Sequence, residues 1–264
     1  MQVSFVARSG DALRALSSGT LVVGAFEGGA LLPAAQEVDA ALNGALTRAV
    51  AAAKFKAKTG QFIEILAPPN SKASRVLLAG LGQADAVNAA RAENLGAHVV
   101  ARLLNVETSV TFAIEPPKRA KISASEFAAH VAFGAELRSY RFDTYRANSK
   151  DDPVTLTAIT LATSAVPAAR KAWTTLGALS QGISWARDLV NEPWSHLNTL
   201  QFAGAIEEAG DKSGFSVEIL EQEKIAALKM GGLLAVNKAS SVPPRFCILE
   251  WKPAGAGNGK PVVL

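Results

Sequence analysis

Apolar and polar positions in the first part of the chain follow two different periods. Short apolar runs bounded by Gly or Pro are typical of strands, and the longer Ala- and Leu-rich stretches between them are typical of helices. Strands separated by whole helices need crossover connections, which favour a mainly parallel or mixed sheet covered by helices. The predicted strands are 3–6, 21–26, 62–66, 75–79, 109–114 and 154–161, and the predicted helices are 33–54, 85–104 and a helix from Ser123 or Ser125 to about 148.

The pattern changes near residues 164–167, where a new long helix begins. The next helix has a marked start, because Asn198 is placed to cap it and Gln201 follows as the reciprocal partner. Gly231 and Gly232 are expected to stop a further helix. The predicted helices are 168–189, one from Asn198 to about 210, and 221–230, and the predicted strands are 215–220 and 245–251.

These patterns together predict an α/β protein with two domains. Residues 1–166 are expected to form an N-terminal three-layer α/β domain with a mixed sheet, and residues 167–264 the beginning of a second α/β domain. The last residues, Pro261–Leu264, have the composition of an opening buried strand. We therefore expect the second domain to be incomplete in this chain.

Composition limits the class of protein. Of the 264 residues, 49% are hydrophobic and 19% are charged, as in a soluble globular protein with a packed core. Cys247 is the only cysteine, so no disulfide can form within one chain, and a reducing cytoplasm is expected. Arg8, Asp11 and Arg14 interrupt any N-terminal secretory pattern, and the apolar runs are far shorter than the ~20 residues that cross a bilayer.

The formal charge is +4 and the sequence pI is about 9.2. The densest basic segments are 54–58 and 118–121. Both could contact phosphate, but neither has the repeated aromatic residues of a single-strand binding surface. Solvated loop charge is the favoured interpretation, with nucleic-acid binding as the alternative.

Residues that could perform chemistry are few. Gly80-Leu81-Gly82 lacks the third small residue of a dinucleotide motif and has Asp85 in its place, which favours a plain turn. Asp151 and Asp152 are most simply a turn before a proline. The three histidines are too far apart in sequence to suggest a metal site; they are His98, His130 and His196.

Nucleophilic catalysis is equally unsupported. Ser195 and His196 are sequence neighbours, which does not establish a catalytic geometry, and a Gly-x-Ser-x-Gly motif is absent. Cys247 lies in a predicted buried strand, where a thiol normally packs and does not react. The sequence contains no convincing catalytic set.

Several segments nevertheless resemble one family, the leucyl (cytosol) aminopeptidases. The second half is similar to the start of their catalytic domain, and Arg75–Leu78 with Gly80–Gly82 is loosely similar to their N-terminal domain, as is Tyr140–Phe142. Asn198-Thr199 and Ala239-Ser240 depart from the family's usual Thr-Pro and Gly-Ser. The matching segments of the second half are Ala186–Asn191 with Pro193, Leu197, Met230–Val236, Pro243–Arg245 and Leu249–Trp251.

The resemblance implies a metallopeptidase, a hydrolase that removes N-terminal residues from peptides in a cytoplasmic hexamer. Two divalent ions, manganese, zinc or magnesium, would activate water and hold the substrate. The family's ligands, a Lys, several Asp and a Glu, follow a strand that matches Pro261–Leu264, so they would lie after Leu264. Lys260 precedes that strand and is not nominated.

We therefore assign no catalytic, cofactor-binding or metal residue and expect no metal and no activity in this chain alone. One alternative hypothesis is a regulatory module that binds nucleic acid or protein without catalysis. Another is an intact non-enzymatic homologue that ends natively at Leu264.

Overall fold

The computed structural model describes residues 1–8, 19–69, 71–117, 119–146, 154–252, 255, 260 and 262–263. The chain separates into a first unit, Met1–Trp185, and a second unit, Ala186–Leu264. This division lies within the long helix α6 (Val166–Asn191), whose predicted extent was 168–189. The domain boundary proposed at residues 166/167 stays a prediction.

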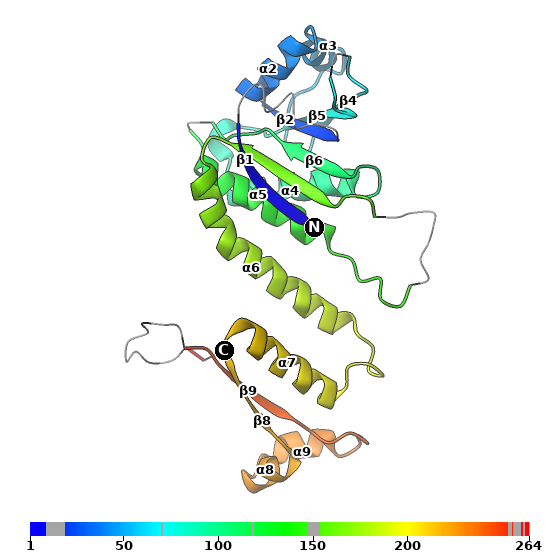
Figure 1. Cartoon of the computed structure of the whole chain (residues 1–264), viewed down its shortest axis with the longest axis vertical. Coiled ribbons are helices and arrows are strands. Elements are labelled where there is room, and N and C mark those ends of the chain that lie inside the picture. Colours follow the sequence, from blue (N-terminus) through cyan, green and yellow to red (C-terminus); the bar gives the residue numbers. More distant parts are fainter. Residues whose placement is uncertain are drawn as a thin grey trace. The chain divides into compact units, whose positions relative to one another are not determined.

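A mixed sheet forms the centre of the first unit (Figure 1). Its order is β1-β7-β6-β2-β5-β4, parallel from β1 to β5, with β4 antiparallel to β5 and the short β3 antiparallel to β2. The mixed α/β architecture predicted from the sequence is confirmed. The strands are β1 (Gln2–Ala7), β2 (Thr20–Phe26), β3 (Ala30–Leu31), β4 (Phe62–Leu66), β5 (Arg75–Gly80), β6 (Ser109–Phe112) and β7 (Ala158–Thr163).

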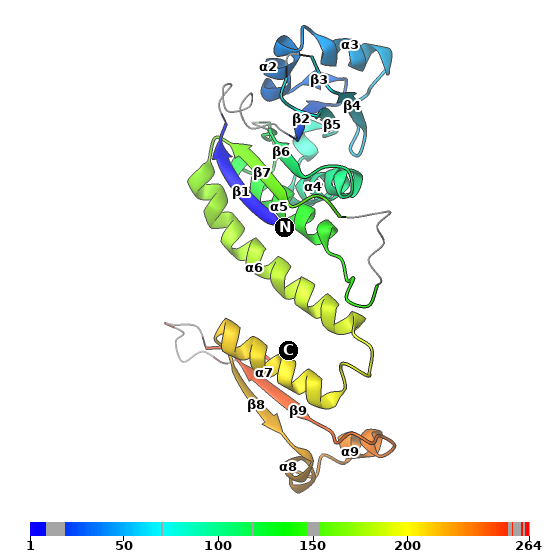
Figure 2. The ribbon, with the colours of Figure 1, turned by 45° about the vertical axis from the view of Figure 1, so that its right-hand side comes forward.

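Both faces of this sheet are covered, which gives three layers (Figures 1 and 2). Successive residues of a strand point to opposite faces, and the core follows that rule. Val22 and Leu77 pack with helices α4 (Ala89–Leu103) and α5 (Ala124–Ser139) and with the beginning of α6. Val23 and Leu78 pack on the other face with α2 (Pro33–Ala41) and α3 (Ala45–Ala52). The central strands are therefore continuous apolar runs.

Helices α4 and α5 pack with their backbones in close contact. A side chain on Gly96 would overlap the carbonyl oxygen of Val131, and one on Gly134 would overlap that of Glu93. Each glycine is required because any Cβ would force the helices apart. Beside this contact, His130 Nδ1 lies 2.7 Å from Glu93 Oε1 and joins the two helices by a side-chain pair.

The predicted helix over 33–54 is wrong in one respect, because two helices occupy it. The left-handed residues Asn43 (φ 53°) and Gly44 (φ 77°) break the helix between α2 and α3. Asp39 Oδ1 then accepts hydrogen bonds from Leu46 N at 2.7 Å and Thr47 N at 3.1 Å. A carboxylate of α2 thus caps α3, which periodicity alone does not reveal.

Other boundaries move by a few residues. The expected helix over 85–104 begins at Ala89, because Asn88 caps it and residues Ala84–Ala86 form a separate short 3₁₀ turn, η1. Helix α5 begins after Ser123, which forms a capping box with Glu126, and ends at Ser139 and not near 148. The predicted strand over 154–161 corresponds to β7, which begins later, at Ala158, and ends later, at Thr163.

The second unit pairs two antiparallel strands beside short helices. Asn198 caps α7 as predicted, since its side chain accepts a hydrogen bond from Leu200 N at 3.0 Å. α7 ends where Gly214 adopts φ 79°, a left-handed conformation that glycine takes without strain. The elements are α7 (Thr199–Ser213), β8 (Ser216–Leu220), α8 (Gln222–Ala227), α9 (Gly231–Asn237) and β9 (Phe246–Glu250).

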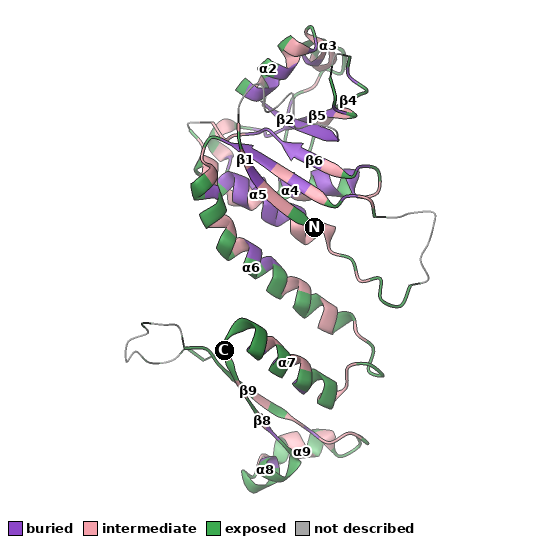
Figure 3. Cartoon of the chain, viewed as in Figure 1, coloured by how far each residue is buried: buried purple, intermediate pink, exposed green. Residues whose placement is uncertain are grey.

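Two sequence predictions fail in this unit. Gly231 and Gly232 begin helix α9 and do not end the preceding helix, because the break comes earlier, at Lys229 with φ 56°. The strand β9 was expected to be buried, yet Ile248 and Leu249 are 42% and 51% exposed (Figure 3). Apolar composition predicts a strand but does not say what covers it.

The predicted terminal strand over 261–264 falls partly outside the described residues. Val262 and Val263, which are described, are 88% and 86% exposed and belong to no strand. For these two residues the prediction of a buried strand is wrong, because no strand among the described residues pairs with them.

Candidate functional site

The family-like segments of the second unit form its connections. Ala186–Asn191 is the last part of α6. The chain then turns at Pro193, whose carbonyl oxygen accepts hydrogen bonds from His196 N and Leu197 N, both at 2.9 Å. This turn leads directly to the Asn198 cap of α7, so the segment sets where α7 begins.

The segment before β9 is tied to two helices. Thr199 Oγ1, at the start of α7, donates a hydrogen bond to the carbonyl oxygen of Pro243 at 2.8 Å. Arg245 Nη2 lies 3.2 Å from the carboxylate of Glu221, the residue that precedes α8. In the described residues these matching positions hold elements together, which is a structural role.

Ser195 and His196 do approach each other, with Oγ and Nδ1 3.0 Å apart. Both side chains are exposed and belong to the turn between α6 and α7. Catalysis would also need a group that orients the imidazole and donors that stabilise an oxyanion. The contact between these two neighbouring residues does not by itself establish such a constellation.

Cys247 lies in β9, with its thiol partly buried. Burial raises the pKa of the Cys247 thiol, and the nearby Arg245 opposes that shift only in part. The thiol therefore stays protonated at neutral pH, and the nucleophilic thiolate is scarce. This agrees with the interpretation of Cys247 as a packing residue, although its strand is more exposed than predicted.

The histidines remain apart. His130 pairs with Glu93 between α4 and α5, and His98 is exposed on α4. Within the described ranges, no three His, Cys, Asp or Glu side chains come together as a metal site. The residues described here therefore do not fit the two-metal centre that the resemblance implies. Lys260 is exposed, and Asp151 and Asp152 lie outside the described residues.

The Gly80-Leu81-Gly82 turn has a packing explanation. A Cβ on Gly80 would lie 2.7 Å from the carbonyl oxygen of Ala57, and Gly82 adopts φ 69°. Asp85 follows in η1. Both glycines are thus required by close backbone approach and left-handed geometry, without any nucleotide.

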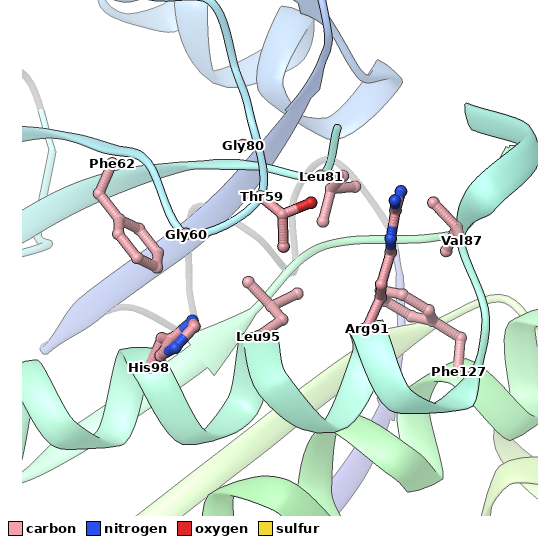
Figure 4. A pocket seen from close by; sticks show the side chains of 10 residues that line it. All are labelled: Thr59, Gly60, Phe62, Gly80, Leu81, Val87, Arg91, Leu95, His98 and Phe127. Atoms are coloured by element: carbon pink, nitrogen blue, oxygen red, sulfur yellow. The ribbon is translucent and has the colours of Figure 1, made fainter. Parts of the chain in front are cut away.

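A hollow lies next to this turn in the first unit (Figure 4). It holds about 310 Å³, much of it open to solvent, and its enclosed part has room for about one water molecule. Sequence reasoning missed it, because its residues come from two loops, the adjoining ends of β4 and β5, and two helices, and no spacing links them. The lining residues are Thr59, Gly60, Phe62, Gly80, Leu81, Val87, Arg91, Leu95, His98 and Phe127.

Comparison with protein families gives matches to both units. The profile described as the N-terminal domain of the cytosol aminopeptidase family matches residues 22–149. The profile described as the catalytic domain of that family matches residues 184–264. The second match begins close to the division between the two units, which follows Trp185.

Curated relatives agree with this assignment. A protein named "Probable cytosol aminopeptidase" from Rhizobium rhizogenes is 38% identical over 225 residues, covering 82% of this chain and 44% of the relative. A protein of the same name from Sinorhizobium fredii is 34% identical over 226 residues, covering 84% of this chain and 44% of the relative. The chain thus spans less than half the length of these relatives.

Solved structures share the fold. The bottromycin maturation enzyme BotP in complex with Mn is 27% identical, with a TM-score of 0.71 over 90% of this chain and 46% of BotP. A mutant of tomato leucine aminopeptidase is 23% identical, with a TM-score of 0.79 over 94% of this chain and 50% of that chain. The second likeness concerns the fold alone.

The two family matches cover most of the chain, so it belongs to the cytosol aminopeptidase family, a family of peptidases. The resemblance drawn from the sequence is confirmed. Both units are α/β units of the kind found in leucine aminopeptidase. No helix in the described part of the chain combines the length and apolar character that a membrane crossing requires.

Proposed function

We propose that the whole protein is a metal-dependent aminopeptidase that releases N-terminal amino acids from peptides. The observation that supports this most is the match of residues 184–264 to the catalytic domain of the family. Because the chain spans 44% of the Rhizobium relative, the activity is proposed for a protein of the relatives' length. The 264 residues themselves are proposed to supply the N-terminal domain, residues 1–166, and the start of the catalytic domain, residues 167–264.

We further propose that the complete enzyme uses two divalent ions, which would activate a water molecule and stabilise oxyanion charge. Manganese, zinc and magnesium are the candidates, and the Mn complex of BotP supports manganese. Since the described residues offer no ligand set, the ligands are proposed to lie beyond residue 264. This chain's own contribution is positional: the contacts of Thr199 and Arg245 fix the segment that leads into β9.

The peptide substrates, the cytoplasmic location and the hexameric state are proposals of the same kind. The relatives' name, cytosol aminopeptidase, supports the location. Native mass spectrometry of the full gene product tests the assembly, and a mass of six subunits is expected.

The activity is tested by comparing two preparations of confirmed intact mass: the full gene product, read past codon 264, and residues 1–264. With Mn²⁺ added, the full product is expected to hydrolyse leucine p-nitroanilide, to lose that activity with a chelator and to regain it when metal is restored. Residues 1–264 are expected to show no turnover and no stoichiometric Mn²⁺ binding.

Two results would contradict the proposal in different ways. A full product inactive with manganese, zinc and magnesium would reject the aminopeptidase function and favour the regulatory module. Turnover by residues 1–264 alone would place the catalytic groups within this chain and reject the proposed location of the ligands.

A further inference from the structure

Three lysines lie on the loop that passes the carboxyl end of β5, a loop to which the proposed aminopeptidase function assigns no role. Lys54, Lys56 and Lys58 are exposed, whereas Ala57 between them is fully buried. Among the described residues, no carboxylate lies within 4.0 Å of the charged atoms of these lysines or of Arg91. Their charges are therefore not neutralised by ion pairs in the described structure.

The loop that bears the lysines is held in place by its backbone. Gly82 N donates a hydrogen bond to Ala57 O at 2.9 Å, and Gly28 N donates to Lys56 O at 3.2 Å. Lys58 N donates to Gln61 Oε1 at 3.0 Å. These bonds fix the backbone of the loop against the ends of β2 and β5, so binding an anion would not require the loop backbone to be ordered first.

The hollow described above opens beside this loop (Figure 4). A Cβ placed on Gly82 would lie 2.8 Å from Thr59 Oγ1 and 3.3 Å from Arg91 Nη1, so the hydroxyl and the guanidinium converge there. Arg91 Nη1 donates to Gln83 O at 3.3 Å, which leaves further guanidinium donors for a ligand. No acidic residue is among the described residues that line the hollow.

We propose that this place binds a compact oxyanion, the phosphate group of a small phosphate ester or of a nucleic-acid backbone. Arg91, Thr59 and Lys58 would donate to the phosphate oxygens, a pairing that suits guanidinium and hydroxyl donors. Because the enclosed part has room for only about one water molecule, the phosphate group would lie in the part of the hollow that is open to solvent. The position also matches the general rule that open α/β sheets bind ligands beyond the carboxyl ends of their strands.

Nearby acidic residues limit the strength of the site. Glu27 donates its backbone N–H to Gly82 O at 2.9 Å, and Asp85 follows in η1; both are exposed. Their carboxylates reduce the local positive potential without pairing with the lysines. The expected affinity for free phosphate is therefore weak, with a Kd on the order of millimolar.

The test is an amide NMR titration of the 264-residue chain with sodium phosphate, against sodium chloride at equal ionic strength. Saturable shifts are expected at Thr59, Gly60 and Gly82 with phosphate only. Arg91→Gln should weaken binding about tenfold, and Lys58→Gln less. Lys72→Gln, an exposed lysine before the opposite end of β5, is the matched control and should change nothing.

A second titration with a 20-nucleotide single-stranded DNA separates the two sources. If the DNA displaces phosphate and its affinity falls steeply with salt, the backbone is the ligand; phosphate binding without DNA binding indicates a small phosphate ester. Shifts that match those of chloride, or that persist in Arg91→Gln and Lys58→Gln, would overturn the proposal. If Arg91→Gln does not fold, Lys58→Gln decides. None of these results depends on peptidase activity.

Discussion

The apolar strand residues are buried in the first unit and largely exposed in the second unit. In the first unit, strands β2 and β5 are covered on both faces, and Val22, Leu77 and Leu78 have no exposed surface. In the second unit, β9 has the same kind of sequence, yet Phe246, Ile248 and Leu249 are between 39% and 51% exposed. Similar strand sequences therefore end in different environments, because the number of covering elements differs.

This difference indicates where the free energy of folding resides. Apolar burial contributes about 25 cal/mol per Å², so the first unit obtains most of the hydrophobic stabilisation. The exposed apolar side chains of the second unit fall in the segment that matches the catalytic domain, and relatives of that domain continue well beyond it. We expect the first unit to respond strongly to core substitutions and the second unit weakly.

The largest contrast should come from truncating matched leucines. Leu77→Ala in β5 removes a fully buried side chain and should lower the free energy of unfolding by about 2–5 kcal/mol. Leu249→Ala in β9 removes a half-exposed one and should cost less than about 1 kcal/mol. Urea denaturation with hydrogen exchange read separately for each unit measures both, and equal costs would invalidate the comparison.

A second contrast uses glycines inside helices. Gly134→Ala in α5 would force a Cβ into the backbone of Glu93 and should destabilise the first unit by about 1–3 kcal/mol. Gly204→Ala in α7 meets no atom within 4 Å and should stabilise that helix by roughly 0.5–1 kcal/mol. Thermal unfolding should shift downward for Gly134→Ala and upward for Gly204→Ala. An unchanged or raised unfolding temperature for Gly134→Ala would show that α4 and α5 can separate at little cost.

The exposed strand of the second unit gives a chemical test. Because burial raises the pKa of Cys247, its alkylation by iodoacetamide should be slower than that of glutathione near neutral pH. The rate should rise with pH to a midpoint above that of glutathione. Arg245→Gln removes the opposing positive charge and should move that midpoint higher still. A midpoint below that of glutathione would mean that the thiol is not desolvated.

The smallest effect concerns the helix caps. Hydrogen bonds from the Ser123 side chain and backbone lower the pKa of Glu126. The ionised Glu126 carboxylate therefore contributes its full stabilisation above the ordinary pKa of a glutamate. This contribution is lost as the pH falls through the lowered pKa of Glu126 in the folded protein. After allowance for solvent screening, we expect less than about 1 kcal/mol.

The matched cap in the second unit, Asn198, does not titrate. Asn198→Ala should lower stability by about 1 kcal/mol equally at neutral and acid pH, whereas Glu126→Gln should remove only the acid-dependent part. The measurement is the unfolding midpoint of each variant between pH 6 and pH 3. A wild-type profile unchanged by Glu126→Gln would rule out this cap as a source of pH dependence.

The sequence predicted the alternation of strands and helices because each element has its own period of apolar residues. It did not predict the break between α2 and α3, because the capping carboxylate of Asp39 comes from the preceding helix. It also took Gly231 and Gly232 as a stop, although the left-handed residue is Lys229. Glycine permits a turn but does not require one.

The residues of the candidate site also fall into two groups, those that local sequence predicts and those that only the fold brings together. The family segments could be recognised from the local amino-acid sequence, because they specify turns, helix caps and strand starts that follow one another along the chain. The burial of β9 could not be predicted, since it depends on which elements lie over it. The hollow beside Gly82 could not be predicted either, because Thr59 and Arg91 meet only after the sheet has formed.

The close packing of α4 and α5 at Gly96 and Gly134 also has a mechanical consequence. Because the backbones of α4 and α5 are in close contact, the two helices cannot slide or rotate against each other without steric overlap. They should therefore move as one rigid body. Arg91 sits on α4, so its position is governed by the seating of α5 on the sheet as well as by its own helix. A substitution in α5 should therefore also change the position of Arg91 and the hollow beside the carboxyl end of β5.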